Sequence, residues 1–476
     1  MTKIVYFAGG HFLLYFGRKK VFGMTKHISP FKKMLARKAV KYIDKDPETN
    51  IPKILEWLEK TDKNGHKVGS EARQIQEVFM DKGGNWHKLI MSLWSDVDDH
   101  IRVKLFENFV VNTSLIGGHT LDYYRQKLDI NVPWAILMDP TSACNLHCIG
   151  CWAAEYGHKQ NLTLEELDDI INQGKKLGTH FYIFSGGEPM VRKNDIIKLC
   201  EKHQDCAFLA FTNGTLIDDK FAEDCVRVGN FVPAISVEGF EEATDSRRGE
   251  GTYKRLTKGM EILKKHKVPF GVSCCYTSAN TADIGSEAFI DDIIAKGAKF
   301  AWFFTYIPVG KDAVSDLMVS PKQRKFMYDK LREYRKTKPL FTLDFWNDGE
   351  YAGGCIAGGR RYLHINANGD IEPCAFIHYA EKNIHKDTLM DALRSPLFMQ
   401  YHKRQPFNKN MLRPCPLLDN PEQLEQMVTI TKALSTDMQK PENVCDLCAK
   451  TKAAAKKWTP IADKLWEANP KSRQTR

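Results

Sequence analysis

An α/β fold is predicted for this chain of 476 residues by three observations. Short apolar runs alternate with amphipathic helical runs from residue 133 to about 345, polar and cysteine-containing motifs follow those runs, and 43% hydrophobic with 27% charged residues is ordinary globular usage. The length allows two or three domains. Regular strand–helix alternation indicates parallel strands joined by crossover helices, in an open sheet or an incomplete barrel.

Six strands are expected, and each is followed by a helix. The strands are Trp134–Met138, Phe181–Phe184, Ala207–Phe211, Phe231–Val237, Phe270–Tyr276 and Phe300–Ile307. The helices are Leu164–Leu177, Asn194–His203, Asp218–Val228, Tyr253–Lys265, Glu287–Ala295 and Pro321–Arg335. In both arrangements the active groups belong at the carboxyl ends of the strands.

Different patterns flank this core. Residues 1–130 read as helical, with amphipathic runs at Ile51–Lys60 and Ile101–Asn112 and no catalytic constellation. From about Phe345 the alternation stops and Gly, Pro and Cys become frequent, which indicates an irregular region pinned by something other than a large core. We expect domains at 1–130, 131–345 and 346–450, and a helical tail at 451–476.

The net charge of +10 is concentrated at the N-terminus. Residues 1–43 hold ten Lys or Arg and no Asp or Glu, which leaves 59 basic and 59 acidic residues elsewhere. This argues against a nucleic-acid-binding body and favours one anionic contact, although a solvated terminus is the simpler alternative. The apolar run Ile4–Phe16 is too short and broken to span a bilayer. We therefore expect a cytoplasmic protein, without specific nucleic acid, whose arm contacts the inner face of the membrane.

The chain has thirteen cysteines, an odd number, and no signal-peptide cleavage site is recognised. Both observations argue against a disulfide framework. Cys144, Cys148 and Cys151 lie on one loop directly after the first strand, with C-x3-C-x2-C spacing. Three such thiolates can hold three corners of a four-iron cluster and leave the fourth iron free. A zinc site is the alternative, but a structural one needs four closed ligands.

Ser185-Gly186-Gly187-Glu188-Pro189 ends the second strand, one strand–helix unit after the cysteine loop. In this order the two motifs resemble those of the radical S-adenosylmethionine (SAM) superfamily. The resemblance implies a partial (βα)6 barrel and a [4Fe–4S] cluster that cleaves SAM to a 5′-deoxyadenosyl radical, which abstracts hydrogen from a substrate. It also implies that Gly186, Gly187 and Glu188 hold the SAM amino group. Where the family often has an aromatic residue before the last cysteine, this chain has Gly150.

Three further positions match SAM-contacting residues of similar enzymes. They are Asn213 after the third strand, Ser236 at the end of the fourth, and Arg248 in a D-x-x-R-G stretch. The resemblance implies contacts to the SAM ribose or carboxylate. Taken alone, each fits a structural role, as at the Asn213-Gly214 turn. Glu238 stands where the related motif usually has Asp.

The C-terminal region carries five more cysteines, namely Cys355, Cys374, Cys415, Cys445 and Cys448. The stretch 366–370 reads as a hairpin that brings Cys355 and Cys374 together. The region resembles the auxiliary-cluster domains called SPASM and twitch. This implies an auxiliary [4Fe–4S] cluster on Cys355, Cys374, Cys415 and one of Cys445 or Cys448. A mononuclear iron or zinc site on the C-x2-C pair is the alternative.

The other cysteines are expected to pack as small apolar side chains: Cys200, Cys206, Cys225, Cys274 and Cys275. Only one of the adjacent pair 274 and 275 can face the interior. Candidate substrate-side groups, for which a structural role is the simpler alternative, are Tyr306, His364 and His378.

The resulting expectation is a radical SAM enzyme with an unidentified substrate, for which the basic arm favours a membrane lipid. A peptide-modifying enzyme is the alternative within this class. Outside the class of radical SAM enzymes, the alternatives are an iron–sulfur electron-transfer protein and a zinc-structured module. The resemblance also implies a low-potential electron donor such as ferredoxin or flavodoxin.

Overall fold

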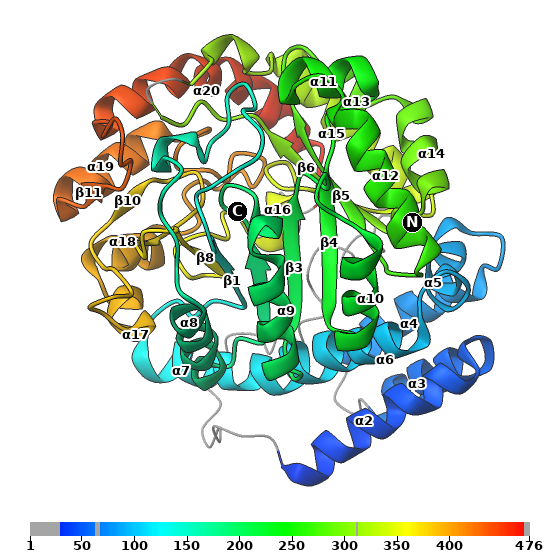
Figure 1. Cartoon of the computed structure of the whole chain (residues 1–476). Helices are drawn as coiled ribbons and strands as arrows, with labels where there is room; N and C mark the ends of the chain where they lie inside the picture. The colour runs from blue at the N-terminus through cyan, green and yellow to red at the C-terminus, as the bar shows by residue number, and fades with distance from the viewer. Residues whose placement is uncertain (1–28, 62–66, 311–312, 471–476) are drawn as a thin grey trace.

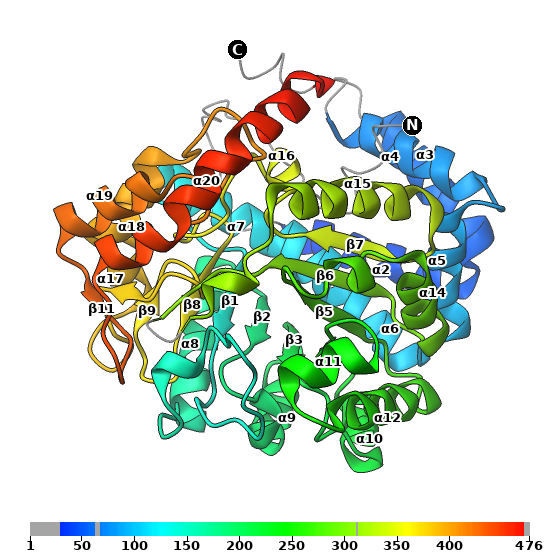
Figure 2. The same cartoon turned by 90° about the horizontal axis from the view of Figure 1, so that it is seen from above.

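A nine-stranded sheet organises the chain in the computed structural model, which describes residues 29–61, 67–310 and 313–470. Its strand order is β7-β6-β5-β4-β3-β2-β1-β8-β9, and every pairing is parallel except β8 with β9. The strands are β1 Ala135–Met138, β2 Phe181–Phe184, β3 Ala207–Thr212, β4 Phe231–Ser236, β5 Gly271–Tyr276, β6 Phe300–Thr305, β7 Phe341–Asp344, β8 Tyr362–Ile365 and β9 Ile371–Glu372. The sheet curves around a central space, as Figure 2 shows from above.

All six expected strands are present, within two residues of the expected bounds. The helices of this core lie outside the curved sheet (Figure 2). They are α8 Leu164–Leu177, α9 Lys193–Lys202, α10 Asp219–Val228, α11 Glu241–Arg248, α12 Thr252–Lys265, α13 Thr281–Ile284, α14 Glu287–Lys296 and α15 Pro321–Thr337, with 3-10 turns η2 Ala154–Tyr156, η3 Pro189–Arg192 and η4 Ser315–Leu317. Helix α8 has the expected bounds because a capping box at Thr163 starts it and left-handed Gly178 ends it.

Three strands extend the expected set. β7 adds a seventh parallel strand next to β6, and β8 pairs in parallel with β1 on the other side. The hairpin expected at residues 366–370 is confirmed, because it joins β8 to antiparallel β9. The C-terminal region thus contributes a strand directly to the barrel sheet.

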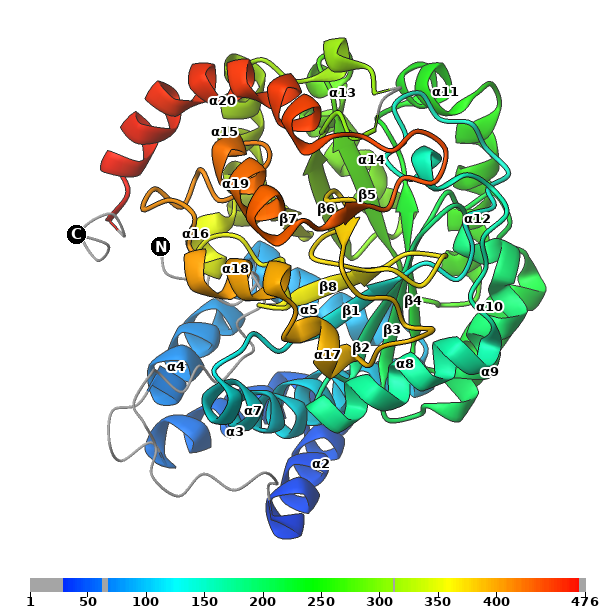
Figure 3. The ribbon, with the colours of Figure 1, turned by 90° about the vertical axis from the view of Figure 1, so that its left-hand side faces the viewer.

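The rest of the C-terminal region consists of short helices and a small strand pair, which lie together on one side of the barrel (Figure 3). These are α16 Gly349–Ala352, α17 Leu389–Leu393, α18 Pro396–Arg404, α19 Pro421–Thr431, and β10 Tyr379–Ala380 paired with β11 Leu434–Ser435. The final helix, α20 Val444–Glu467, begins before the tail expected at 451–476 and carries Cys445 and Cys448 in its first turn.

The N-terminal region is helical, as expected, and lies below the strands in Figure 1. It comprises α2 Pro30–Lys45, α3 Pro47–Thr61, α4 Lys67–Met80, α5 Asn85–Ser95, α6 Asp99–Phe106, the π-helix η1 Glu107–Gly117 and α7 Gly118–Leu128. The apolar run Ile4–Phe16 lies outside the described residues. No helix in the described ranges has both the length and the apolarity needed to cross a bilayer.

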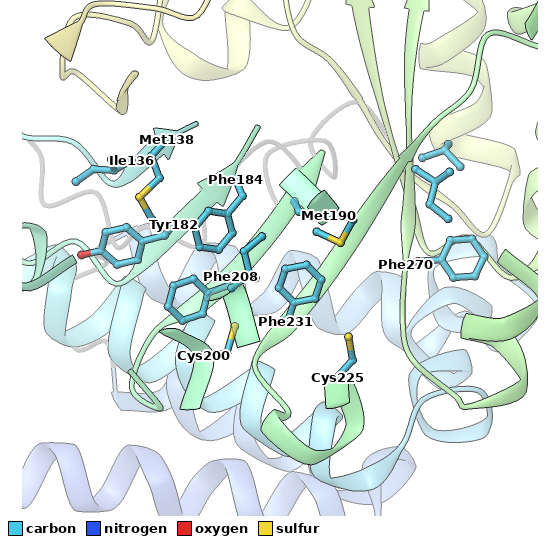
Figure 4. Close-up of a cluster of buried hydrophobic side chains, with 14 of the residues drawn as sticks. Ile136, Met138, Tyr182, Phe184, Met190, Cys200, Phe208, Cys225, Phe231 and Phe270 are labelled. Atoms are coloured by element: carbon cyan, nitrogen blue, oxygen red, sulfur yellow. The ribbon is translucent and has the colours of Figure 1, made fainter. Parts of the chain in front are cut away.

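The hydrophobic core has an outer and an inner part. Figure 4 shows the outer part, where Tyr182, Phe208 and Phe231 point from the sheet toward the helices and pack with Cys200 and Cys225. Alternate strand positions, such as Phe181, Leu209 and Ala234, belong to the inner part. The inner part continues into the C-terminal region, which joins that region to the barrel.

Candidate active site

A cavity of about 240 Å³ lies at the carboxyl ends of β1–β6. All nine residues that the sequence assigns to the catalytic cluster and to SAM line it: Cys144, Cys148, Cys151, Gly186, Gly187, Glu188, Asn213, Ser236 and Arg248. The structure therefore brings together residues that are spread over about 105 positions of sequence.

The cysteine loop is pinned against the turn after β2. The Gly187 amide donates to the Thr141 carbonyl at 3.0 Å, and the Glu188 amide donates to the Ala143 carbonyl at 2.8 Å. A Cβ on Gly187 would lie 2.2 Å from the Ala143 oxygen, and one on Gly186, where φ is +102°, 2.5 Å from the Thr141 oxygen. Glycine is required here so that the two backbones can approach closely.

The three cysteines are half-buried, and the structure provides partners for their sulfur atoms. Burial raises the pKa of Cys144 to about 11. The Leu146 amide donates to its Sγ at 3.4 Å. Burial also raises the pKa of Cys148, opposed by Arg248, whose Nη1 is 3.9 Å from the Cys148 Sγ. The Cys144 and Cys148 thiols are thus protonated in the free protein, so binding a metal cluster there would release protons.

Glu238 anchors two arginines beside this loop. Its fully buried carboxylate accepts hydrogen bonds from Arg247 Nη1 at 2.6 Å and from Arg248 Nε at 2.9 Å. Arg247 and Ile149 also exchange hydrogen bonds, the Ile149 amide donating to the Arg247 carbonyl at 2.9 Å. Arg247, which the sequence analysis missed, thereby fixes the loop between Cys148 and Cys151.

Glu188 and Asn213 have most of their polar atoms paired within the protein. The Glu188 carboxylate accepts from the Thr212 hydroxyl at 2.6 Å, the Asn213 amide at 2.7 Å and the Met190 amide at 2.9 Å. Asn213 donates through Nδ2 to Asn145 on the cysteine loop at 2.8 Å. Asn213 therefore supports the loop as well as lining the cavity.

The space beside Gly150, the residue before the last cysteine of the loop, is filled by a tyrosine that follows another strand. Gly150 has a φ of +66°, and a Cβ there would lie 2.7 Å from the hydroxyl of Tyr306. Tyr306 follows β6, lines the cavity and accepts from the Val314 amide at 3.1 Å. Trp152 instead packs against His364 and Phe376 of the C-terminal region, with ring centroids 5.7 and 5.8 Å apart.

His364 and His378 are structural rather than substrate-side groups. His364 is fully buried with Nε2 2.9 Å from Asp139 Oδ2 and Nδ1 2.6 Å from Glu372 Oε2. Although burial lowers its pKa, these two carboxylates prevail and raise it to about 10. His378 pairs with Asp437 at 2.5 Å. Neither histidine lines the cavity.

Four of the five C-terminal cysteines gather around Tyr401. Burial raises the pKa of Cys374 to about 12 and also that of Cys355 and Cys415. These three line one cavity together with Tyr401. Burial raises the pKa of the Tyr401 hydroxyl, and these cysteines and Cys448 raise it further. Cys445 is exposed and points to Glu425 Oε1, 3.5 Å from its Sγ.

Two features of this second group fit a bound cluster. The amides of Leu417 and Leu418 donate to the Cys415 Sγ at 3.4 and 3.3 Å, which suits a thiolate ligand. The buried Tyr401 hydroxyl has no hydrogen-bond partner among the described residues, so it can donate to a sulfur atom.

Four of the remaining five cysteines pack in the core as expected. Cys200, Cys206, Cys225 and Cys274 are buried in the outer core, whereas Cys275 lines the cavity.

Comparison with known proteins bears on these sites. Residues 138–280 match the model of the radical SAM superfamily, and residues 355–416 match that of SPASM, an iron–sulfur cluster-binding domain. An AdoMet-dependent heme synthase of Methanosarcina barkeri is 25% identical over 286 residues, 54% of this chain and 80% of that protein. The mycofactocin maturase MftC of Mycolicibacterium smegmatis is 24% identical over 267 residues, 52% of this chain and 65% of that protein.

Among solved structures, Streptococcus suis SuiB bound to its precursor peptide SuiA has a similar fold. The TM-score is 0.53 at 16% identity, over 80% of this chain and 90% of SuiB.

The fold and these matches define an iron–sulfur enzyme of the SAM-cleaving class. The chain contains a radical SAM domain, matched over residues 138–280, and a C-terminal SPASM domain, matched over residues 355–416. Its cofactors are accordingly a [4Fe–4S] cluster, SAM and auxiliary iron–sulfur clusters in the SPASM domain.

Proposed function

We propose that Cys144, Cys148 and Cys151 hold the catalytic [4Fe–4S] cluster and that Gly186, Gly187, Glu188, Asn213, Ser236 and Arg248 position SAM beside it. The observation that carries this is the single cavity that all nine residues line. When bound, the cluster and SAM supply the electron and the 5′-deoxyadenosyl radical that abstracts hydrogen from substrate.

The chain's own residues provide position and charge. Glu238 holds Arg248 near the cluster loop, where its guanidinium can face the SAM carboxylate. Glu188 Oε2 accepts one hydrogen bond within the protein, from the Asn213 amide, and has capacity for the SAM amino group. Aromatic residues at the floor of the cavity exclude water from the reacting atoms.

For the auxiliary cluster we favour Cys355, Cys374, Cys415 and Cys448 as ligands. The first three line one cavity, and Cys448 shares the surroundings of Tyr401 with them, whereas Cys445 faces outward. The domain division at 1–130, 131–345, 346–450 and 451–476 is part of the same proposal. The two family matches fall inside its second and third units, whereas helix α20 crosses its last boundary.

Substituting these cysteines tests the ligand set. We expect Cys374→Ala and Cys448→Ala to reduce the iron content from about eight to about four atoms per chain, because one four-iron cluster is lost. Cys445→Ala is the matched control and should keep the full content. Iron analysis of anaerobically purified protein measures this. Loss of iron in the Cys445 variant but not in the Cys448 variant would reverse the assignment.

For the substrate we propose a membrane lipid, and for the electron donor a low-potential protein such as ferredoxin or flavodoxin. The lipid is supported by the basic N-terminal arm and by the apolar walls of the cavity, which include Leu137, Phe211, Trp302 and Phe304. The arm would then contact the anionic membrane surface peripherally. A peptide is the competing substrate class.

Release of 5′-deoxyadenosine from the reduced, cluster-loaded enzyme tests the proposed function. We expect vesicles of phosphatidylethanolamine and phosphatidylglycerol to increase the release several-fold over the enzyme with SAM alone. Release that vesicles do not change would contradict the lipid proposal and direct the search to peptides. Absence of release from enzyme with full iron content would contradict the catalytic assignment.

A further inference from the structure

We propose that the lower half of the barrel interior binds one long aliphatic chain, which reaches it from an anionic bilayer surface beneath α2. This inference rests on the proposed lipid substrate and adds to it where the chain lies and from which side it enters.

The interior below the active site is hollow. A cavity of about 540 Å³ lies among the inward-facing residues of the strands, among them Phe181, Leu209, Val232 and Trp302. One part of it is lined by Cys355, Cys374 and Cys415, where we place the auxiliary cluster. Side chains normally fill a barrel interior of this size. The whole volume is within the range of ligand sites, and a chain would occupy the part that lies away from these cysteines.

This lower cavity adjoins the proposed SAM site. Six aromatic residues line both cavities, and we call them the aromatic partition: Trp134, Phe181, Trp302, Phe345, Tyr362 and Phe376. A chain in the lower cavity would therefore point one part of its length toward the radical-forming site.

The polar groups of the lower cavity are unevenly placed. Asp44 of α2, Arg102 of α6 and Lys299 lie toward the N-terminal layer, where Arg102 Nε donates to Asp44 Oδ1 at 2.8 Å. Lys299 pairs with Asp96 next to this layer. Apolar side chains dominate between these residues and the aromatic partition. Asp344, Asp348 and Arg361 line the cavity elsewhere, so the basic surface of α2 rather than the lining places the charged headgroup at that end, and the apolar walls fit the tail.

Helix α2 covers that end and has the character of a membrane-surface helix. Val40 and Ile43 line the cavity on its inner side. Its outer side exposes Phe31 and Leu35, 66% and 42% accessible, together with Met34 and Tyr42. The helix also carries six basic residues and a single acidic one, Asp44. Exposed apolar side chains among lysines match the boundary of an anionic bilayer.

The orientation has a chemical consequence. A lipid that enters tail first from α2 keeps its headgroup at the lower end, so its distal methylene or methyl groups come nearest to the SAM site. The C–H bond that breaks belongs to that distal part, and its hydrogen atom forms the new bond to C5′ of 5′-deoxyadenosine.

Chain binding is measured with a doxyl-labelled stearate and the full-length, cluster-loaded protein. We expect immobilised electron paramagnetic resonance lines at one probe per chain, and at least tenfold weaker binding in Leu209→Trp, which fills the cavity. Val232→Leu is a milder filling variant, should the first not fold. Ile430→Trp adds bulk at an exposed site on α19 and should bind as the wild type does. Equal binding by the folded filling variants would overturn the inference.

The entrance is tested by sedimentation with phosphatidylglycerol vesicles. We expect Lys38→Glu/Lys41→Glu on α2 to reduce the bound fraction at least fivefold, and the exposed pair Lys254→Glu/Lys258→Glu on α12 to leave it unchanged. Equal reduction in both variants, or self-association through α2 in place of vesicle binding, would overturn the docking surface. Both assays work without turnover, so they can fail while 5′-deoxyadenosine is still released, and the two proposals are tested separately.

Discussion

Replacing Cys148 with alanine is expected to abolish 5′-deoxyadenosine formation. Cys148 is the central cysteine of the loop that we assign to the catalytic cluster, and its Sγ lies 3.9 Å from Arg248. Loss of a direct ligand should exceed the roughly 10–100-fold cost of losing an outer hydrogen-bond partner of a metal site. The measurement is product formation by reduced enzyme, quantified by chromatography.

Cys225→Ala provides the control for this variant. Cys225 is buried on α10 beneath the sheet, as Figure 4 shows, and has no proposed role in cluster binding. We expect its iron content and its activity to stay near those of the wild type. A Cys148→Ala enzyme that cleaves SAM at the wild-type rate would show that this loop does not hold the catalytic cluster.

The second large effect is expected for Glu238→Gln. The substitution leaves two buried guanidinium groups, those of Arg247 and Arg248, without the carboxylate that they share. Breaking a buried ion pair from one side costs about 3–5 kcal/mol of the free energy of unfolding. Because Arg248 also loses its fixed position, we expect SAM to bind more than about tenfold more weakly, which is 1.4 kcal/mol.

Urea denaturation and equilibrium dialysis with labelled SAM measure these two quantities under anaerobic conditions. Glu261→Gln is the matched control, since Glu261 and its partner Lys258 are 70% and 69% exposed and 3.5 Å apart. Its cost should not exceed about 1 kcal/mol. Unchanged SAM affinity in a destabilised Glu238 variant would show that this carboxylate supports only the fold.

Much of the barrel could be predicted from the sequence because its periodicities are local. The run Phe181–Phe184 and the helix Leu164–Leu177 carry their own apolar pattern and end signals. β7 (FTLD) and β8 (YLHI) were not expected, since each contains a polar residue and no long helix follows either of them. β8 pairs with β1, more than 220 positions earlier, and no local pattern encodes that contact.

The candidate site also contains residues that the sequence could predict and residues that it could not. Its cysteines and glycines belong to short motifs, so their spacing alone indicates the chemistry. Arg247 and Tyr306 act through distant partners, Ile149 and Gly150 respectively. The choice of Cys448 over Cys445 depends on which side of α20 faces Tyr401, and the hollow lower barrel depends on how large side chains pack. The sequence order carries neither of these facts.

Electron paramagnetic resonance of the reduced enzyme, recorded with and without SAM, tests the central claim most directly. The account predicts a signal of a reduced [4Fe–4S] cluster that changes when SAM is added, because SAM binds at the iron that Cys144, Cys148 and Cys151 leave open. It also predicts that this SAM-sensitive signal is absent from Cys148→Ala and retained in Cys374→Ala. Spectra in which no cluster signal responds to SAM, or a SAM-sensitive signal that survives in Cys148→Ala, would contradict the account.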